Sequence, residues 1–229
     1  MPEINSPYHY KKFKRTSVDG KRLYQNPWGD PVPSVTTILS DTQPAEKRAG
    51  LAAWRKRVGK EEAQRITTTA ANRGTVMHNI LEHWALGEYE TYNPGNNIVH
   101  RQAKAMAQVV VENIENDIDE LWGTEVNLVA KELYAGTTDL VGVYKGKPTI
   151  MDFKQTNKPK KREWIDDYFL QGAAYAIAHN EMYGTDISRI AIFMCSGDCQ
   201  WQLFECGPDE FPEYELKWAE RLEKFYNLS

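Results

Sequence analysis

Two aspartates and a lysine stand on consecutive apolar runs of the sequence, at a spacing that places them on neighbouring strands. Asp139 lies in the first run, and Asp152 and Lys154 lie in the second. The segment Lys145–Pro148 between the runs predicts a hairpin turn, because Lys-Gly-Lys-Pro contains strong turn-forming residues. Side chains on a strand alternate between its two faces, so Asp152 and Lys154 are expected to project to the same side.

This combination of residues predicts phosphodiester hydrolysis. Charged groups inside apolar strands are costly unless they are paired or bound to an ion, and a divalent cation between the two carboxylates would meet that condition. Such a cation activates water and polarises a phosphoryl oxygen, while an ammonium group offsets the charge that grows on the phosphorus oxygens. These residues could instead have purely structural roles. Asp139 and Asp152 would then be strand-end or turn residues, and Lys154 would lie at a strand edge and oppose aggregation.

Two further motifs lie on either side of this set in the sequence. The upstream segment Gly74–Glu82 reads G-T-x-x-H-x-x-x-E, and Gln171 and Tyr175 downstream read Q-x-x-x-Y. In this order, and over about residues 74–175, the motifs resemble those of the RecB-like branch of the PD-(D/E)XK nuclease superfamily. The small size of the chain and the segment Pro33–Leu39 resemble the stand-alone exonucleases of phage and mitochondria.

The resemblance implies a role for each residue of the central motifs. His78, Asp139 and Asp152 would bind Mg²⁺ or Mn²⁺, for which oxygen ligands with one imidazole are suitable. The main-chain carbonyl of Phe153 would complete the ligands that the protein supplies. Lys154 would align the attacking water and stabilise the transition state. A lone helical histidine is more often structural, but the acidic residues downstream favour the ligand role for His78.

Three more residues are candidates for the same site. Glu132 lies one predicted strand before Asp139, at a position that resembles an acidic residue of family members, which implies a supporting role at the metal or at a second metal. Gln171 and Tyr175 lie one helical turn apart and project together. Their amide and hydroxyl could bind a phosphate or brace Lys154, and the alternative is a surface glutamine beside a core tyrosine.

Basic and hydroxyl side chains outside these motifs predict contacts with DNA. A helix that begins at Ser34 would present hydroxyl and backbone N–H groups to a phosphate. Basic helices, and the basic loop directly after the catalytic strand, could hold the DNA backbone beside the scissile bond, although charged runs are also typical of solvated surfaces. The residues expected to contact DNA are Ser34, Thr36, Thr37, Arg55, Arg57, Lys158, Lys160 and Lys161.

The charge is unevenly distributed along the chain, which supports DNA as the partner. The net charge is −4, but residues 1–75 hold 14 Lys and Arg against 7 Asp and Glu, whereas residues 76–229 hold 14 against 25. An asymmetry of this kind suggests a basic portion that holds DNA. The expected DNA is single-stranded or has a free end, and a single-strand-binding protein or a recombinase would be a compatible protein partner.

The three cysteines, Cys195, Cys199 and Cys206, all lie late in the chain. Some RecB-like nucleases carry an iron–sulfur cluster held by one cysteine upstream of the motifs and three downstream, and such clusters require four thiolates. Because no cysteine precedes Cys195, we expect no iron–sulfur cluster. A zinc site with His179 as the fourth ligand is an open alternative.

The composition is that of a globular protein without a membrane anchor. A hydrophobic fraction of 41%, with 11% aromatic residues, is sufficient for a packed core. No apolar run approaches the roughly 18 residues that a membrane span needs, and the N-terminal segment lacks the apolar centre of a signal peptide. We therefore expect a cytoplasmic protein, in the host cytoplasm if a phage encodes it, with no membrane partner.

The order of predicted elements indicates the fold class. Helices fill most of the first half, and strands separated by one long helix fill the second. This order and the resemblance predict an α/β (α+β mixed) fold with a restriction-endonuclease-like core, in which helices flank a central mixed sheet, preceded by an N-terminal hairpin and a helical arch. We expect one nuclease domain over residues 1–229, with 1–60 as a DNA-binding elaboration and 61–229 as the catalytic core. The predicted strands of the sheet are 125–134, 138–144, 149–155, 189–195 and 200–206.

The expected function is metal-dependent hydrolysis of DNA, as an exonuclease on single-stranded DNA or flapped ends in phage DNA replication, recombination or degradation. The exonuclease mode follows from the resemblance, because relatives thread a strand beneath a helical arch. Two alternatives stay open. One is a structure-specific endonuclease with the same ligands, and the other is a nuclease-derived module that binds DNA without turnover.

Overall fold

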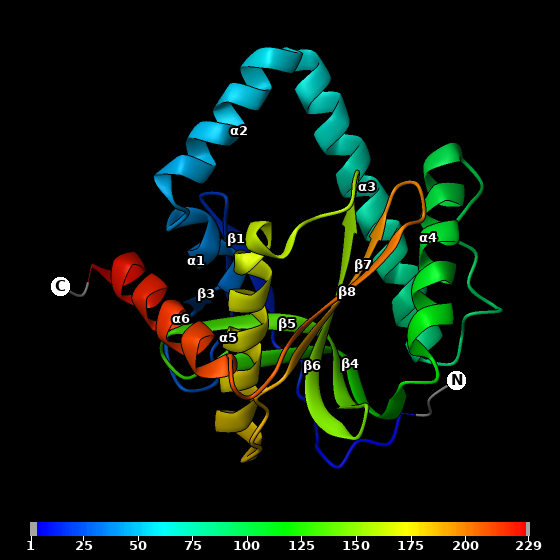
Figure 1. Cartoon of the computed structure of the whole chain (residues 1–229). Helices are drawn as coiled ribbons and strands as arrows, with labels where there is room; N and C mark the ends of the chain where they lie inside the picture. Colours follow the sequence, from blue (N-terminus) through cyan, green and yellow to red (C-terminus); the bar gives the residue numbers. More distant parts are fainter. Residues whose placement is uncertain (1–3, 228–229) are drawn as a thin grey trace.

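The structure is a computed structural model that describes residues 4–227 of the chain. Its centre is a five-stranded sheet (Figure 1) formed, in this order, by β4 (Ile118–Ala130), β5 (Tyr134–Tyr144), β6 (Lys147–Thr156), β7 (Ile190–Ser196) and β8 (Trp201–Cys206). Strands β6 and β7 run parallel, and the other neighbouring pairs are antiparallel.

Helices cover both faces of this sheet, which confirms the expected mixed sheet flanked by helices (Figure 1). They are α3 (Lys60–Ala85) and α4 (Ile98–Ile114) on one face, and α5 (Asp166–Tyr183) with α6 (Phe211–Tyr226) on the other. Because both faces are covered, the central strands are apolar on both sides. On β6, Ile150 packs in the cluster with α5, whereas Met151 and Phe153 pack in the cluster with α3 and α4.

The helices follow from their capping residues and their small or apolar faces. Asn97 caps α4, because its side chain accepts a hydrogen bond from the backbone N–H of His100 at 2.9 Å. In α5, Gly172 lies so close to the sheet that a Cβ there would stand 2.5 Å from Ile190, so that position requires the small residue. In α4, Ala103, Ala107, Val110 and Ile114 recur at helical spacing and form one buried apolar stripe.

Strands β5 and β6 separate where the predicted site residues lie. Their pairing ends at Leu140 and Met151. Beyond that pair, β5 continues against β4, whereas β6 continues against β7 as far as Thr156 (Figure 1). Asp139 and Asp152 are therefore the first residues past the last pair. We refer to this point as the strand fork.

The N-terminal part forms a small three-stranded sheet followed by a short helix. The expected first hairpin is present, and its turn residues Asp19 and Gly20 adopt left-handed backbone conformations, with φ of 50° and 76°. Tyr24 packs this small sheet against the central sheet at Val129 and Ala135. The elements are β1 (Arg15–Val18), β2 (Lys21–Tyr24), β3 (Val32–Pro33) and α1 (Val35–Asp41).

An arch rises above the sheet (Figure 1). Its arms are α2 (Ala45–Val58) and the first half of α3, joined at Gly59, whose φ of 87° suits glycine. No residue of α2 is buried, as is typical of a helix that stands in solvent. No helix among residues 4–227 is long and apolar enough to cross a membrane. The division of the domain at residue 60 stays a prediction, and the second arm of the arch falls within the part predicted as core.

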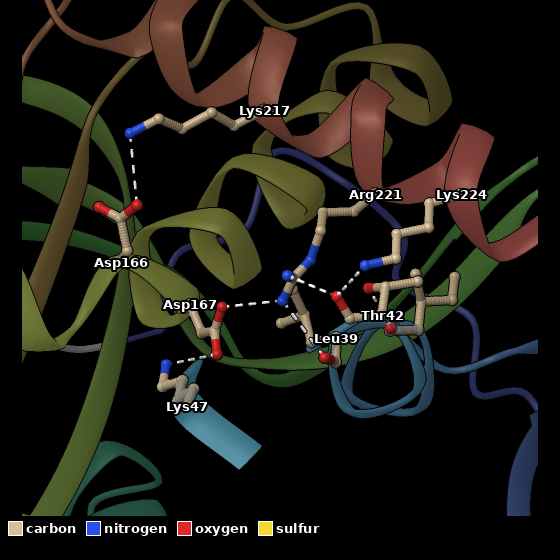
Figure 2. A network of polar contacts seen from close by, with 9 residues as sticks. Leu39, Thr42, Lys47, Asp166, Asp167, Lys217, Arg221 and Lys224 are labelled. Atoms are coloured by element: carbon tan, nitrogen blue, oxygen red, sulfur yellow. Dashed lines mark hydrogen bonds and ion pairs between the residues drawn. The ribbon is translucent and has the colours of Figure 1, made fainter. Parts of the chain in front are cut away.

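The foot of the arch is tied to α5 and α6 by polar contacts (Figure 2). Arg221 of α6 donates hydrogen bonds to the backbone carbonyls of Thr42 and Leu39, at 2.9 and 3.2 Å, directly before α2 begins. It also pairs with Asp167 of α5 at 2.9 Å, and Asp167 pairs with Lys47 of α2 at 2.6 Å. These contacts fix the first arm of the arch at one end only.

A buried histidine joins the N-terminal segment to α5. The imidazole of His179 contacts the hydroxyls of Tyr10 at 2.9 Å (Nε2) and Thr185 at 2.8 Å (Nδ1). Thr185 donates its own proton to Asn180, so it accepts from the Nδ1–H of His179, and Nε2 accepts from Tyr10. Burial lowers the pKa of His179 to about 4. Both ring nitrogens are engaged, which removes His179 as a zinc ligand.

This histidine should make folding stability fall in mild acid. The folded-state pKa of about 4 lies below the unfolded value of about 6.5, so the unfolded chain takes up the proton first. The contribution of neutral His179 to the free energy of unfolding is therefore fully present above about pH 6.5. It declines by about 3 kcal/mol in total as the pH falls toward the folded-state pKa. In urea unfolding at pH 7 and pH 5, His179→Gln should show a smaller loss of stability than the native chain. Equal losses would contradict the assignment.

Candidate active site at the strand fork

Asp139 is held at the strand fork by groups from two other elements. The backbone N–H of Phe153 on β6 donates a hydrogen bond to its Oδ2 at 2.7 Å. The Nδ1 of His78 on α3 lies 3.3 Å from its Oδ1. The carboxylate therefore links β5, β6 and α3, and two of the predicted metal ligands, His78 and Asp139, lie in direct contact.

Asp152 and Lys154 form a buried ion pair on the side of β6 that faces α5. The ammonium of Lys154 contacts the Oδ2 of Asp152, and the two side chains are 16% and 4% exposed. Tyr168 of α5 places its ring centroid 5.0 Å from the Lys154 Nζ, a distance at which the ring attracts the cation. The lysine is thus held between a carboxylate on its own strand and an aromatic ring of the neighbouring helix.

The pKa values of these groups follow from burial and from their neighbours. Burial alone would raise the pKa of Asp139, but His78 and Lys154 outweigh it and hold that pKa below its ordinary value. Burial raises the pKa of Asp152, although Lys154 opposes the change. For His78, burial would lower the pKa, but the Asp139 carboxylate raises it overall. For both aspartates, nearby basic groups favour the ionised form and oppose the effect of burial.

Glu125 is a site residue that the sequence reasoning missed. It lies on β4 with a left-handed backbone, φ 48°. Its carboxylate, the imidazole of His78 and the carboxylate of Asp139 offer ligand atoms that all lie within 4.8 Å of one another. Burial raises the pKa of Glu125 to about 7, and the charges of Asp139 and Glu82 add to the effect. A third carboxylate therefore lies at the strand fork.

Glu132, which was expected to take that role, lies elsewhere. It is exposed in the turn between β4 and β5, so its expected place on a strand beside Asp139 was wrong. Ala130 pairs with Tyr134, so Glu132 is the centre of the hairpin. In the antiparallel pair of β4 and β5, the residue opposite Asp139 is then Glu125, because Thr124 pairs with Leu140 and Val126 with Thr138. Correct placement of the turn in the sequence would therefore have identified Glu125.

Gln171 and Tyr175 project together from α5, as expected. The side-chain amide of Gln171 donates a hydrogen bond to the Tyr175 hydroxyl at 3.1 Å. Tyr175 is buried, which raises the pKa of its hydroxyl. Its ring lies over Gly136 of β5, where a Cβ would stand 2.4 Å from the ring. Tyr175 thus packs α5 onto the strand that carries Asp139, and no bond to Lys154 is found in the described residues.

The three hydroxyl residues at the start of α1 have different surroundings. Ser34 is buried and caps the helix, because its Oγ accepts from the backbone N–H of Thr37 at 3.0 Å and also contacts the hydroxyls of Thr36 and Thr37. Direct DNA contact by Ser34 is therefore contradicted by its burial. Thr36 is exposed and Thr37 is half-buried, so their predicted contacts remain sterically open.

The basic residues predicted to contact DNA lie on the arch and on one loop. Arg55 and Arg57 are exposed on α2. Lys158 and Lys161 are exposed on the loop between β6 and the short 3₁₀ helix Arg162–Trp164, which passes beneath the arch (Figure 1). Lys160 of this loop is half-buried, and its backbone N–H bonds the Gln202 side chain at 2.7 Å.

The residues of the strand fork are suited to a divalent cation. Three carboxylates and one imidazole form a mainly oxygen donor set, as Mg²⁺ and Mn²⁺ prefer. Among residues 4–227, no group makes a hydrogen bond of normal geometry to the buried Oδ2 of Asp152, despite its contact with Lys154. The three carboxylates face Lys154 and His78 as compensating groups, and a divalent cation would relieve the remaining excess of negative charge. Phe153 supplies its N–H to Asp139, and a ligand role for its carbonyl stays a prediction.

A mixed sheet flanked by helices carries an Asp on one strand, Asp-x-Lys on the next and a histidine from a covering helix. This fold and site resemble those of the PD-(D/E)XK-like nucleases.

In sequence, the chain is similar to mitochondrial genome maintenance exonuclease 1 of several vertebrates. It is 28% identical to the Mus musculus protein over 207 residues, which are 85% of this chain and 59% of that protein. It is 30% identical to the Xenopus tropicalis protein over 169 residues, 69% of this chain and 46% of that one. The chain thus spans about half the length of these relatives, between 46% and 59%.

Comparisons with family models and with solved structures give weaker likenesses or none. No protein-family model matches the chain. The crystal structure of a candidate exonuclease from Eubacterium rectale aligns with 69% of this chain and 68% of its own, with a TM-score of 0.48 and 15% sequence identity.

Removal of the lysine should destabilise the fold in a pH-dependent way. In Lys154→Met, Asp152 stays buried without its partner, and breaking such a pair costs about 3 kcal/mol. The unpaired carboxyl would then have a folded-state pKa above its unfolded value, so protonation at lower pH recovers stability. Urea unfolding should show a larger deficit at pH 8 than at pH 5. Lys147→Met, at the exposed first residue of β6, is the control and should change little at either pH.

Proposed function

We propose that this chain is a metal-dependent deoxyribonuclease that degrades DNA from an end, with single-stranded or flapped DNA as the preferred substrate. The observation that carries the proposal is the strand fork, where ligand atoms of His78, Glu125 and Asp139 lie within 4.8 Å of one another and Asp152 pairs with Lys154. The similarity to proteins named as mitochondrial genome maintenance exonucleases supports DNA as the substrate.

The residues of the strand fork divide the chemistry between them. His78, Asp139 and Asp152 would hold a divalent ion, with Glu125 as an additional acidic group in place of Glu132. When bound, that ion supplies a Lewis acid that polarises the phosphodiester and lowers the pKa of water.

Lys154 supplies the positive charge that the protein itself contributes. Its Nζ donates hydrogen bonds to a phosphoryl oxygen, where negative charge grows during the attack of water. Asp152 and the Tyr168 ring hold the ammonium in place before substrate binds, so little reorganisation is needed in the reaction. Tyr175 has a positioning role and does not contact the substrate, because its ring packs over Gly136 and so holds the strand that bears Asp139.

The arch supports action at a DNA end. A strand that reached the strand fork beneath α2 and α3 would pass between α2, which carries the exposed Arg55 and Arg57, and the loop with Lys158 and Lys161. These contacts go to the backbone and need no particular base sequence. Only a strand with a free end can be threaded through a closed arch. A comparison of linear with circular DNA therefore tests the proposal.

Linear and circular single-stranded DNA of the same sequence should behave differently. With Mg²⁺ or Mn²⁺, the protein should degrade the linear form and spare the circle, and EDTA should stop the reaction. Lys154→Ala should lower the rate by about 100-fold or more, whereas Lys147→Ala should match the native protein. Rapid cleavage of circles would indicate an endonuclease, and binding without any cleavage would indicate a DNA-binding module.

Metal binding should distinguish the two glutamates. In a titration with Mn²⁺ followed by electron paramagnetic resonance, Asp139→Asn and Glu125→Gln should each weaken binding by about tenfold or more, because each removes an oxygen ligand or its close neighbour. Glu132→Gln makes the same change of charge at the exposed turn and should bind Mn²⁺ as the native chain does. Equal effects of the two glutamate variants would contradict the assignment of Glu125.

A further inference from the structure

Arg73 is a buried cation that has no carboxylate partner among the described residues. It lies on α3, one residue before Gly74, and is 5% exposed. Buried arginines are normally paired with acids, because an isolated charge is costly to remove from water. Burial here lowers the pKa of the guanidinium, which is the direction expected when no carboxylate compensates the charge.

The guanidinium instead bonds to neutral oxygens at the end of the catalytic strand. Its Nε and Nη2 donate to the Gln155 Oε1 at 2.9 and 2.7 Å, and Nη2 also donates to the Asn157 Oδ1 and, at 3.4 Å, to the Thr156 carbonyl. Nη1 donates to the Gln102 Oε1 of α4 at 3.3 Å. Gln155 is the residue after Lys154, and Asn157 begins the basic loop beneath the arch.

This arrangement fixes the direction of the carboxamide groups. A guanidinium can only donate, so the amide oxygens of Gln155 and Asn157 must face it and their NH₂ groups must point away. The Gln102 NH₂ group is satisfied by the carbonyl of Gly197 at 2.6 Å. Among residues 4–227, neither Gln155 nor Asn157 has an acceptor bonded to its NH₂ group, although Gln155 is half-exposed and Asn157 is exposed.

The position of Gln155 is set from both sides. A Cβ on Gly74 would stand 3.1 Å from its Cγ, so α3 lies directly against this side chain. Gln155 and Asn157 lie on the α3 side of β6, whereas Asp152 and Lys154 lie on the α5 side. A DNA strand that contacted both pairs would cross the free end of β6 beneath the arch.

We propose that the NH₂ groups of Gln155 and Asn157 form a phosphate-binding subsite for the DNA backbone, next to the scissile phosphate. The inference rests on the proposed nuclease function. Arg73 is the positioning residue of this subsite, because it orients both amides and leaves its positive charge uncompensated. An acid at either position would pair with Arg73 and stabilise the fold, but it would place a carboxylate where the phosphate binds.

The test replaces each amide by the acid of the same shape. Asn157→Asp and Gln155→Glu should match or exceed the native melting temperature, because each gives Arg73 an ion-pair partner. Each should also weaken the binding of a single-stranded oligonucleotide by about tenfold, measured in EDTA so that no cleavage occurs. Asn113→Asp makes the same change of charge at an exposed position of α4 and is the control.

The outcomes separate this inference from the proposed function. If the native chain binds and cleaves DNA while Asn157→Asp and Gln155→Glu bind it as tightly as Asn113→Asp does, the subsite is excluded and the nuclease function stands. Should the native chain neither bind nor cleave DNA, both proposals fail. Asn157→Ala is a further check. It removes the donor without adding charge, so it should weaken DNA binding less than Asn157→Asp, and equal binding by Asn157→Ala and the native chain would count against a hydrogen bond from this residue.

Discussion

The excess of negative charge at the strand fork is the constraint on which the rest of the structure depends. Asp152 is buried and Asp139 and Glu125 are half-buried, so the charge of each carboxylate is only partly offset by water and must be balanced by nearby cations and donors. Lys154 and His78 supply part of that compensation from β6 and α3. The strands must separate here to make room for these side chains, because a continuous ladder would bring the acids onto one crowded face.

The arch follows a different physical rule from the sheet. The central strands are apolar on both faces and are held by burial, whereas α2 buries no side chain at all. Its position depends on polar contacts at its foot, mainly those of Arg221 with the chain before Ala45 and with Asp167. A helix held in this way keeps its polar surface available on all sides, which suits an element that surrounds a charged polymer rather than one that packs in a core.

Much of this architecture could be predicted from periodicity and spacing. The hairpin between the two aspartates and the helical stripe of α4 depend on local patterns that the sequence states directly, whereas the grouping of His78 with Asp139 was implied by the resemblance to RecB-like nucleases. Glu125 was missed because its place depends on where the preceding turn is centred, and a shift of that turn by a few residues exchanges one glutamate for another. The bonds of Arg73 to the end of β6 could not be predicted, since they join residues 82 to 84 positions apart through neutral amides that leave no charge pattern in the sequence.

The parallel pairing of β6 with β7 has a consequence for synthesis of the chain on the ribosome. Beyond the strand fork, Asp152 and Lys154 are supported within the sheet by Ile192 and Met194, which are translated only after the whole of α5. The hairpin of β5 and β6 can form early, but the half of β6 that carries the charged pair has no neighbouring strand until β7 arrives. A nascent or truncated chain that stops before β7 therefore has the acidic residues without the rigid frame that organises them. The proposed nuclease activity would therefore require translation of the chain through β7.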